Sequence, residues 1–167
     1  MIRCSLDTNL VSDLVRNPQG QAAEQVRSVG EAQVCASIIV AAELRNAAAK
    51  RGSPRLARQL EAVLDVIEVP PLGPPADTAY GEIRTRLEET GRPIGGNDLL
   101  IASQAVVLGY TIVTDDETEF ARIEGLRYEN WLRRLCQIAT RTATISIAQL
   151  SAQCVAPFAP AVLGSPL

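Results

Sequence analysis

The stretch TIVTDDETEF, residues 111–120, decides how this chain is expected to fold. Its first three residues are β-branched and favour a buried strand, which ends where the charged residues begin after Thr114. Two adjacent aspartates, Asp115 and Asp116, stand where that strand stops. Because neighbouring carboxylates repel one another, something outside the sequence must offset the repulsion, and a cation is the obvious candidate.

On both sides of this strand, short apolar runs alternate with segments that have helical spacing. Further strands are expected within residues 1–6, 32–37, 66–69 and 126–131. Helices are expected in two pieces over 10–29, broken at Asn17-Pro18, and over 38–52, 53–66, 76–91, 98–109 and 115–123, with Asn97 capping the helix over 98–109. This alternation predicts an α/β fold with a mostly parallel central sheet and helices on both faces.

The composition limits the chemistry that the chain can perform. Its 167 residues carry a net charge of −3 and include no histidine. Ser-His-Asp and Cys-His catalysis and the common zinc sites are therefore excluded, and with Lys50 as the only lysine a phosphate-binding or Schiff-base lysine is nearly unavailable. The acidic balance argues against a broad basic surface for nucleic acid, but not against a nuclease whose metal ions supply positive charge.

One domain is expected over residues 1–135, followed over 136–167 by a low-charge tail that is disordered or loosely packed. No apolar run approaches the ~20 residues that a membrane span needs, and no signal peptide is recognisable. The cysteines show no paired spacing, which predicts reduced thiols in a cytoplasmic protein; they are Cys4, Cys35, Cys136 and Cys154.

Four acids that are remote in sequence are expected at one edge of the sheet. Asp7 and Asp116 follow predicted strands, Glu43 lies on the helix after the second strand, and Asp98 is in the first turn of a strongly apolar helix. Ligands bind outside the carboxyl ends of parallel strands, so these side chains should share a cleft. Hard oxygen donors of this kind select Mg²⁺ or Mn²⁺, and metal-activated water attacking a phosphodiester is the chemistry that fits.

Each acid also has an ordinary structural explanation. Asp7 is a common turn residue and Asp98 suits a helix N-terminus. Glu43 could form an ion pair with Arg45 or with an arginine of another helix. Asp116 is a possible cap for the helix after it, Asp115 is the weaker candidate of the adjacent pair, and Glu117 and Glu119 are interpreted as a solvated helix face. Four such coincidences at one sheet edge are improbable together, so the metal site is the preferred interpretation.

The chain resembles the PIN-domain ribonucleases of the VapC toxin type, in order from residue 1 to about 134. The resemblance is carried by LDTN (6–9), SIIVAAEL (37–44), GRPIGGNDLLIA (91–102) and IVTDDETEFARIEGLRYENW (112–131). It implies a compact PIN fold, Mg²⁺- or Mn²⁺-dependent cleavage of RNA, a homodimer, and a VapB-type antitoxin that occludes the site. It also implies that Asp7, Glu43, Asp98 and Asp116 form the acidic quartet, supported by the Thr114 hydroxyl, although Asp115 remains open as the fourth acid.

The leading hypothesis is thus a metal-dependent endoribonuclease acting on structured RNA such as tRNA. An alternative is a catalytically inactive PIN-like scaffold that only binds an antitoxin partner, which the complete acidic set argues against. A phospho-acceptor receiver domain would need a lysine late in the chain, and Lys50 is the only one. Arg84, Arg86 and Arg92 could touch RNA phosphates, but solvated charge is the preferred interpretation.

Overall fold

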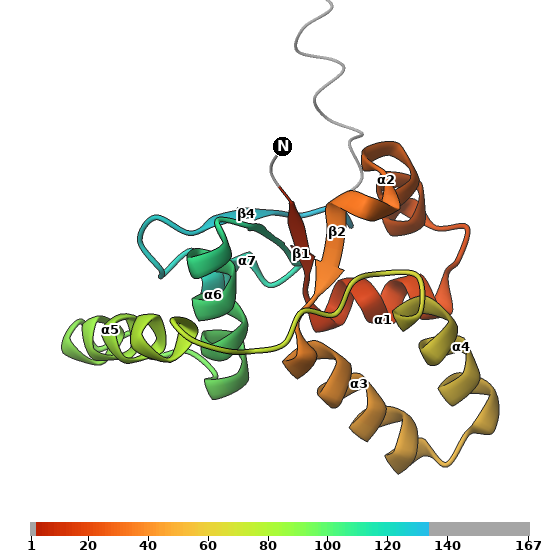
Figure 1. Cartoon of the computed structure of the whole chain (residues 1–167), viewed down its shortest axis with the longest axis horizontal. Coiled ribbons are helices and arrows are strands. Elements are labelled where there is room, and N and C mark those ends of the chain that lie inside the picture. Colours follow the sequence, from red (N-terminus) through yellow and green to blue (C-terminus); the bar gives the residue numbers. More distant parts are fainter. Residues whose placement is uncertain (1–2, 134–167) are drawn as a thin grey trace, which may run out of the picture. The chain divides into compact units, whose positions relative to one another are not determined.

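The computed structural model describes residues 3–133, and the predicted tail over 136–167 lies outside that range. The centre of the fold is a sheet of four short strands in the order β2-β1-β3-β4, with every neighbouring pair parallel (Figure 1). The strands are β1 (Cys4–Leu6), β2 (Val34–Ala36), β3 (Thr111–Val113) and β4 (Arg127–Glu129). The predicted parallel α/β sheet is confirmed, and within the described residues it contains no antiparallel pair.

Seven α-helices and one 3₁₀ turn surround these strands within residues 3–133. Serine side chains cap two of the helices, because the Ser37 hydroxyl accepts from the Ile39 N–H and the Ser53 hydroxyl accepts from the Leu56 N–H. The helices are α1 (Thr8–Arg16), α2 (Gln21–Val29), α3 (Ile38–Arg51), α4 (Pro54–Leu64), α5 (Ala76–Glu89), α6 (Gly96–Leu108) and α7 (Glu117–Phe120), and the 3₁₀ turn is η1 (Glu31–Gln33).

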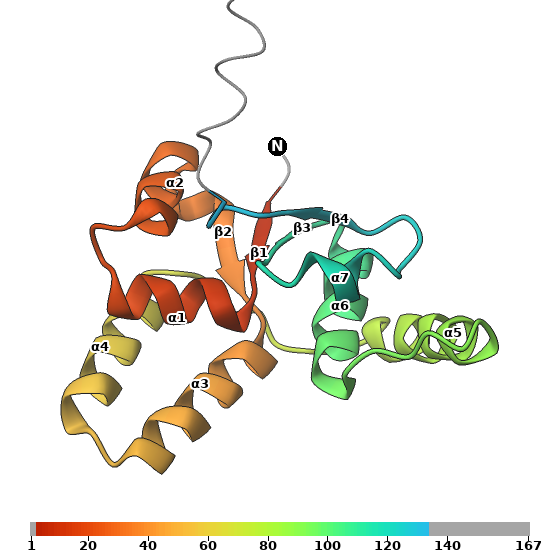
Figure 2. The same cartoon turned by 180° about the vertical axis from the view of Figure 1, so that it is seen from behind.

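Both faces of the sheet are covered at β2 and β3, whereas all three residues of the edge strand β4 are exposed. Every residue of β2 and β3 is buried, although successive side chains of a strand point to opposite faces. Leu6, Ile112, Leu10, Ile101 and Phe120 are among the largest fully buried side chains. In both views α1, α3 and α4 lie to one side of β1, whereas α5 and α6 lie to the other (Figures 1 and 2).

Two local predictions were wrong. The segment predicted as a strand at 66–69 forms only a single bridge, between Cys35 and Glu68, because the two prolines that follow have no N–H to donate to a ladder. The helix predicted to start after Asn97 begins at Gly96 and is capped by Gly95. The Asn97 side chain is thereby free to serve the site described below.

The two described cysteines, Cys4 and Cys35, carry free thiols, as predicted, and burial raises the pKa of Cys35 to about 11. Cys136 and Cys154 lie outside the described residues. Between residues 3 and 133, none of the helices has the length and apolarity that crossing a bilayer requires.

Candidate active site

Asp7 is a buried carboxylate held at the carboxyl end of β1. It caps α1, and its side chain is only 4% exposed. Its Oδ1 accepts from the Thr8 N–H at 2.7 Å, and its Oδ2 accepts from the Thr114 hydroxyl at 2.9 Å. Both oxygens are therefore fixed by groups from the ends of neighbouring strands, which is more than a turn residue requires.

Glu43 reaches the same place from the second turn of α3. Its Oε2 accepts from the Thr8 hydroxyl at 2.5 Å, and its Oε1 accepts from the Asn97 side-chain amide at 2.6 Å. Thr8 thus touches both Asp7 and Glu43, and α1, α3 and α6 are tied together at this carboxylate. The alternative that Glu43 pairs with Arg45 is wrong, because Arg45 pairs with Glu61 at 2.8 Å.

Asp98 is half-buried in the first turn of α6. Its pKa is raised to about 6, mainly by burial and in addition by the charges of Asp7, Glu119, Glu43 and Asp116. These acids come from three other parts of the chain, so the structure does bring the predicted carboxylates together. A side chain at Gly95 would collide with Oδ2 of Asp98, so the glycine makes room for the carboxylate.

The pKa of Asp7 is also raised, first by burial and then by the charges of Glu43 and Asp115, while the hydrogen bonds from Thr114 and Thr8 lower it. Asp115 therefore acts on Asp7, and Asp116 acts on Asp98. Both side chains are exposed, and the roles of Asp115 and Asp116 stay a prediction.

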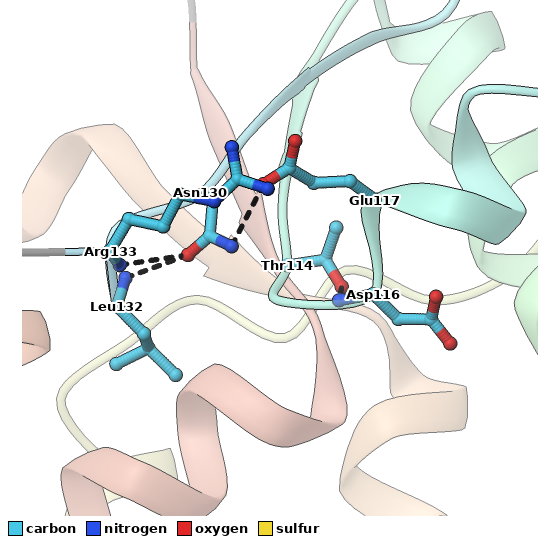
Figure 3. Close-up of polar contacts among 6 residues, drawn as sticks. All are labelled: Thr114, Asp116, Glu117, Asn130, Leu132 and Arg133. Carbon is cyan, nitrogen blue, oxygen red and sulfur yellow. Dashed lines mark hydrogen bonds and ion pairs between the residues drawn. The ribbon is translucent and has the colours of Figure 1, made fainter.

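The loop that carries Asp116 is shaped by Thr114. The Asp116 N–H donates to the Thr114 hydroxyl at 3.0 Å, and the Asp116 side chain makes no capping bond to α7, contrary to the structural alternative (Figure 3). Thr114 is fully buried, and its hydroxyl joins this loop to Asp7. One hydroxyl thus sets the position of two acids.

The start of α7 is anchored to the end of the domain. The Asn130 amide donates to Glu117 Oε1 at 2.9 Å, and Arg133 pairs with the same oxygen at 3.1 Å (Figure 3). The Asn130 carbonyl oxygen accepts from the N–H groups of Leu132 and Arg133. Figure 3 shows the Asp116 carboxylate pointing away from this group, so the anchor holds the loop and leaves the acid available.

Glu117 and Glu119 are not the solvated helix face that the sequence suggested. Both are half-buried, and Glu119 Oε2 accepts from the Gly95 N–H at 3.1 Å, next to Asp98. The signal was present in the spacing, because Glu119 follows Asp116 by three residues and such residues share a helix face. Glu119 therefore adds a further negative charge beside Asp7, Glu43, Asp98 and Asp116, which are called the acidic cluster below.

The donor set fits a hard divalent cation. Within residues 3–133 no ion pair engages Asp7, Glu43 or Asp98. Burial is the main cause that raises the pKa values of Asp7 and Asp98, and neighbouring acidic charges add to it. Carboxylate oxygens are the ligands that Mg²⁺ and Mn²⁺ prefer. In that part of the chain no three acidic or cysteine side chains already stand in the arrangement of a metal site, so the carboxylates would have to close further on an ion.

The chain is similar to known proteins over the whole described domain. The family described as "PIN domain" matches residues 5–126. The tRNA(fMet)-specific endonuclease VapC of Shigella flexneri is 33% identical over 132 residues, which cover 78% of this chain and 99% of that protein.

Solved structures give the same result. The VapBC2 structure from Rickettsia felis, bound to a promoter DNA fragment, has a TM-score of 0.71 at 33% identity and covers 78% of this chain and 99% of that one. The DNA-bound VapBC structure from Salmonella typhimurium has a TM-score of 0.71 at 32% identity, with the same coverage.

Proposed function

Because the chain belongs to the PIN-domain family, in its VapC-type ribonuclease branch, we propose that it is a divalent-metal-dependent endoribonuclease. The reaction is hydrolysis of an RNA phosphodiester bond. In this proposal Asp7, Glu43, Asp98 and Asp116 hold Mg²⁺ or Mn²⁺, which supplies activated water and neutralises the phosphate charge when bound.

One observation carries the proposal: Asp98 has a pKa of about 6 because it is buried among other acids. Acids that raise each other's pKa lower the stability of the fold unless a ligand compensates, and such groups cluster at functional sites. In the described part of the chain the ion pairs all lie elsewhere, so no arginine compensates for Asp7, Glu43 or Asp98. A cation that also binds an RNA phosphate would compensate these charges.

The remaining polar groups of the site orient these acids. Thr8 and Asn97 hold the two oxygens of Glu43, and Thr114 holds Asp7 from the opposite side. The protein has no histidine, so no imidazole can act as a base at this site. Its side chains therefore bind and position, because hydrogen bonds fix both oxygens of Asp7 and both oxygens of Glu43.

We propose tRNA as the substrate class, since the Shigella flexneri relative is named for cleaving initiator tRNA. The test is to incubate the purified chain with total tRNA and with a single-stranded control RNA, in Mg²⁺, Mn²⁺ or a chelator. We expect tRNA fragments only with a divalent ion, and none from Asp7→Asn. Cleavage that persists in the chelator would overturn metal dependence, and preference for the control RNA would overturn the substrate class.

We also propose a VapB-type antitoxin as partner and a homodimer as the assembly, supported by the VapBC complexes among the similar structures and by the resemblance of the sequence. Light scattering on the chain alone tests the dimer. Co-expression with any small reading frame that lies next to its gene tests the antitoxin, since a true partner should co-purify and suppress cleavage. A monomer, or a neighbour that does not bind, would contradict these assignments.

A further inference from the structure

Three arginines line one small hollow at the C-terminal end of α5. The hollow has a volume of about 150 Å³ and lies between the end of α5 and the segment after α7. Its charged lining is Arg86, Arg92, Arg122 and the single acid Glu124, and its apolar lining includes the buried side chains Leu87 and Ile123. Ligand pockets for larger molecules are about 300–1,000 Å³, so this hollow suits a group as small as a phosphate.

The charges of these arginines are only weakly compensated within residues 3–133. Arg92 and Arg122 make no ion pair there. Arg86 has Glu124 at 3.8 Å, and both of those side chains are largely exposed, so the pair is weak and easily exchanged for another anion. Arg122 donates to the Pro93 carbonyl at 2.8 Å, which fixes its guanidinium at the hollow.

The hollow and the acidic cluster share one loop. Arg92 begins the loop, and Asp98 follows six residues later, so the two Cα atoms are at most about 20 Å apart. The segment from α7 onward is tied to this loop twice, because Glu119 accepts from Gly95 and Arg122 donates to Pro93. Negative charge therefore gathers at one end of the loop and positive charge at the other.

We propose that this hollow, defined by Arg86, Arg92 and Arg122, binds a backbone phosphate of the RNA a few nucleotides away from the cleaved bond. The inference rests on the proposed ribonuclease function. Guanidinium groups match phosphate oxygens in pairs, and an apolar floor strengthens the attraction. A stacked strand advances about 3.4 Å per nucleotide, so about six nucleotides bridge even the longest allowed separation from Asp98.

Such a subsite would explain how an acidic protein attracts RNA. The chain is acidic overall and its reaction centre is an acidic cluster, so the protein as a whole repels a polyanion. A localised set of arginines at the side of the centre would attract the strand and set its direction across the acids. Arg86 and Arg92 then have a task, where the sequence alone suggested solvated charge.

The test compares two double variants that remove the same charge. Arg86→Ala/Arg92→Ala removes two arginines of the hollow, and Arg55→Ala/Arg58→Ala removes two exposed arginines of α4 that form no ion pair within residues 3–133. RNA binding is measured by fluorescence anisotropy in an Asp7→Asn background, which prevents cleavage. The probes are a four-nucleotide and a sixteen-nucleotide RNA, each at several salt concentrations.

We expect the hollow variant to bind the long RNA about 10-fold more weakly, with a salt slope smaller by about 0.7 for each lost phosphate contact. The short RNA should bind equally to all variants. With the Asp7 side chain restored, KM for the long RNA should rise while kcat stays unchanged. Arg86→Lys/Arg92→Lys should recover the salt slope but only part of the affinity, since lysine keeps the charge and loses the paired geometry.

Equal binding of the long RNA by the hollow and control variants would overturn the subsite while leaving the ribonuclease intact. An equal loss for the short RNA would also overturn it, since the effect would then be general electrostatics. If the unmodified chain neither binds nor cleaves any RNA, the proposed function itself fails. The two failures are therefore distinguishable.

Discussion

Carboxyl groups have opposite electrostatic surroundings at the carboxyl end of the sheet and on the outer surface of α3 and α4. On the outer surface Glu61 accepts two hydrogen bonds from Arg45, which hold the pKa of that carboxyl below its usual value. At the sheet end, burial and neighbouring acids raise the pKa of Asp98 to about 6. The charge of Glu61 is compensated within the folded chain by Arg45. The charge of Asp98 has no such partner among the described residues, so a bound ligand would have to compensate it.

This difference locates function more sharply than residue type does. Within the described residues, ion pairs engage Glu61, Glu68 and Glu88 at the surface, but not Asp98. An unpaired, half-buried acid that lowers stability is difficult to explain by folding alone. The acids that weaken the fold are therefore the ones to test as metal ligands.

The largest expected effect separates the two regions by activity. Asp98→Asn should lower the rate of RNA cleavage by at least about 10²–10³-fold, the loss typical of removing an electrostatic group from a reaction centre. Glu61→Gln, a matched change from acid to amide, should leave the rate unchanged. Cleavage of labelled tRNA in Mg²⁺ measures both. If Asp98→Asn cleaves at the unmodified rate, the inner acids are not the reaction centre.

The second effect concerns the ion itself. A divalent cation should stabilise the folded chain, by about 2.7 kcal/mol at a concentration one hundred times its Kd. Thermal unfolding during a Mg²⁺ or Mn²⁺ titration measures this gain. Asp98→Asn should lose most of it and Glu61→Gln should keep it. An equal rise in Tm for all three proteins would indicate non-specific binding of the ion.

The sequence could indicate that the four acids lie in one region because strand ends are local signals. Asp7 and Asp116 follow β-branched or apolar runs, and parallel strands bring their carboxyl ends to one edge. Glu43 and Asp98 could be assigned to the same site because an acid among apolar neighbours costs desolvation free energy unless it is paired or bound to a metal. The bonds that hold them could not be predicted, since Thr8, Asn97 and Glu43 meet only through tertiary packing.

The failures have the same origin. Glu119 was interpreted as solvated because its own segment is polar, yet it bonds to Gly95, which is 24 residues away. Residues 66–69 have the β-branched character of a strand, but only Glu68 bridges to the sheet before the chain turns away at two prolines. Local patterns thus placed the acids, whereas partners distant in sequence decided what each acid does.

The third prediction uses pH to compare the regions without any metal. Because the pKa of Asp98 is raised when the chain folds, its charged form is destabilising, so stability should increase as the pH falls from 7 through about 6 toward 4. For this half-buried group we expect about 1–2 kcal/mol. Denaturant unfolding in chelator at several pH values measures it. Asp98→Asn should reduce that increase and leave the part due to Asp7, whose pKa is also raised. A metal-free chain that weakens steadily between pH 7 and 5 would contradict the prediction.

The smallest effect belongs to the outer region and has the opposite sign. Since the pKa of Glu61 is lowered by Arg45, its contribution is present above the usual carboxyl pKa of 4.5 and is lost as the pH falls further. The pair is exposed, so a double-mutant cycle of Arg45→Gln and Glu61→Gln should give a coupling of only about 0.2–1 kcal/mol at pH 7, and less in high salt. A coupling of several kcal/mol would mean that Glu61 stabilises the fold by as much as Asp98 destabilises it. The contrast between the two regions would then no longer identify the reaction centre.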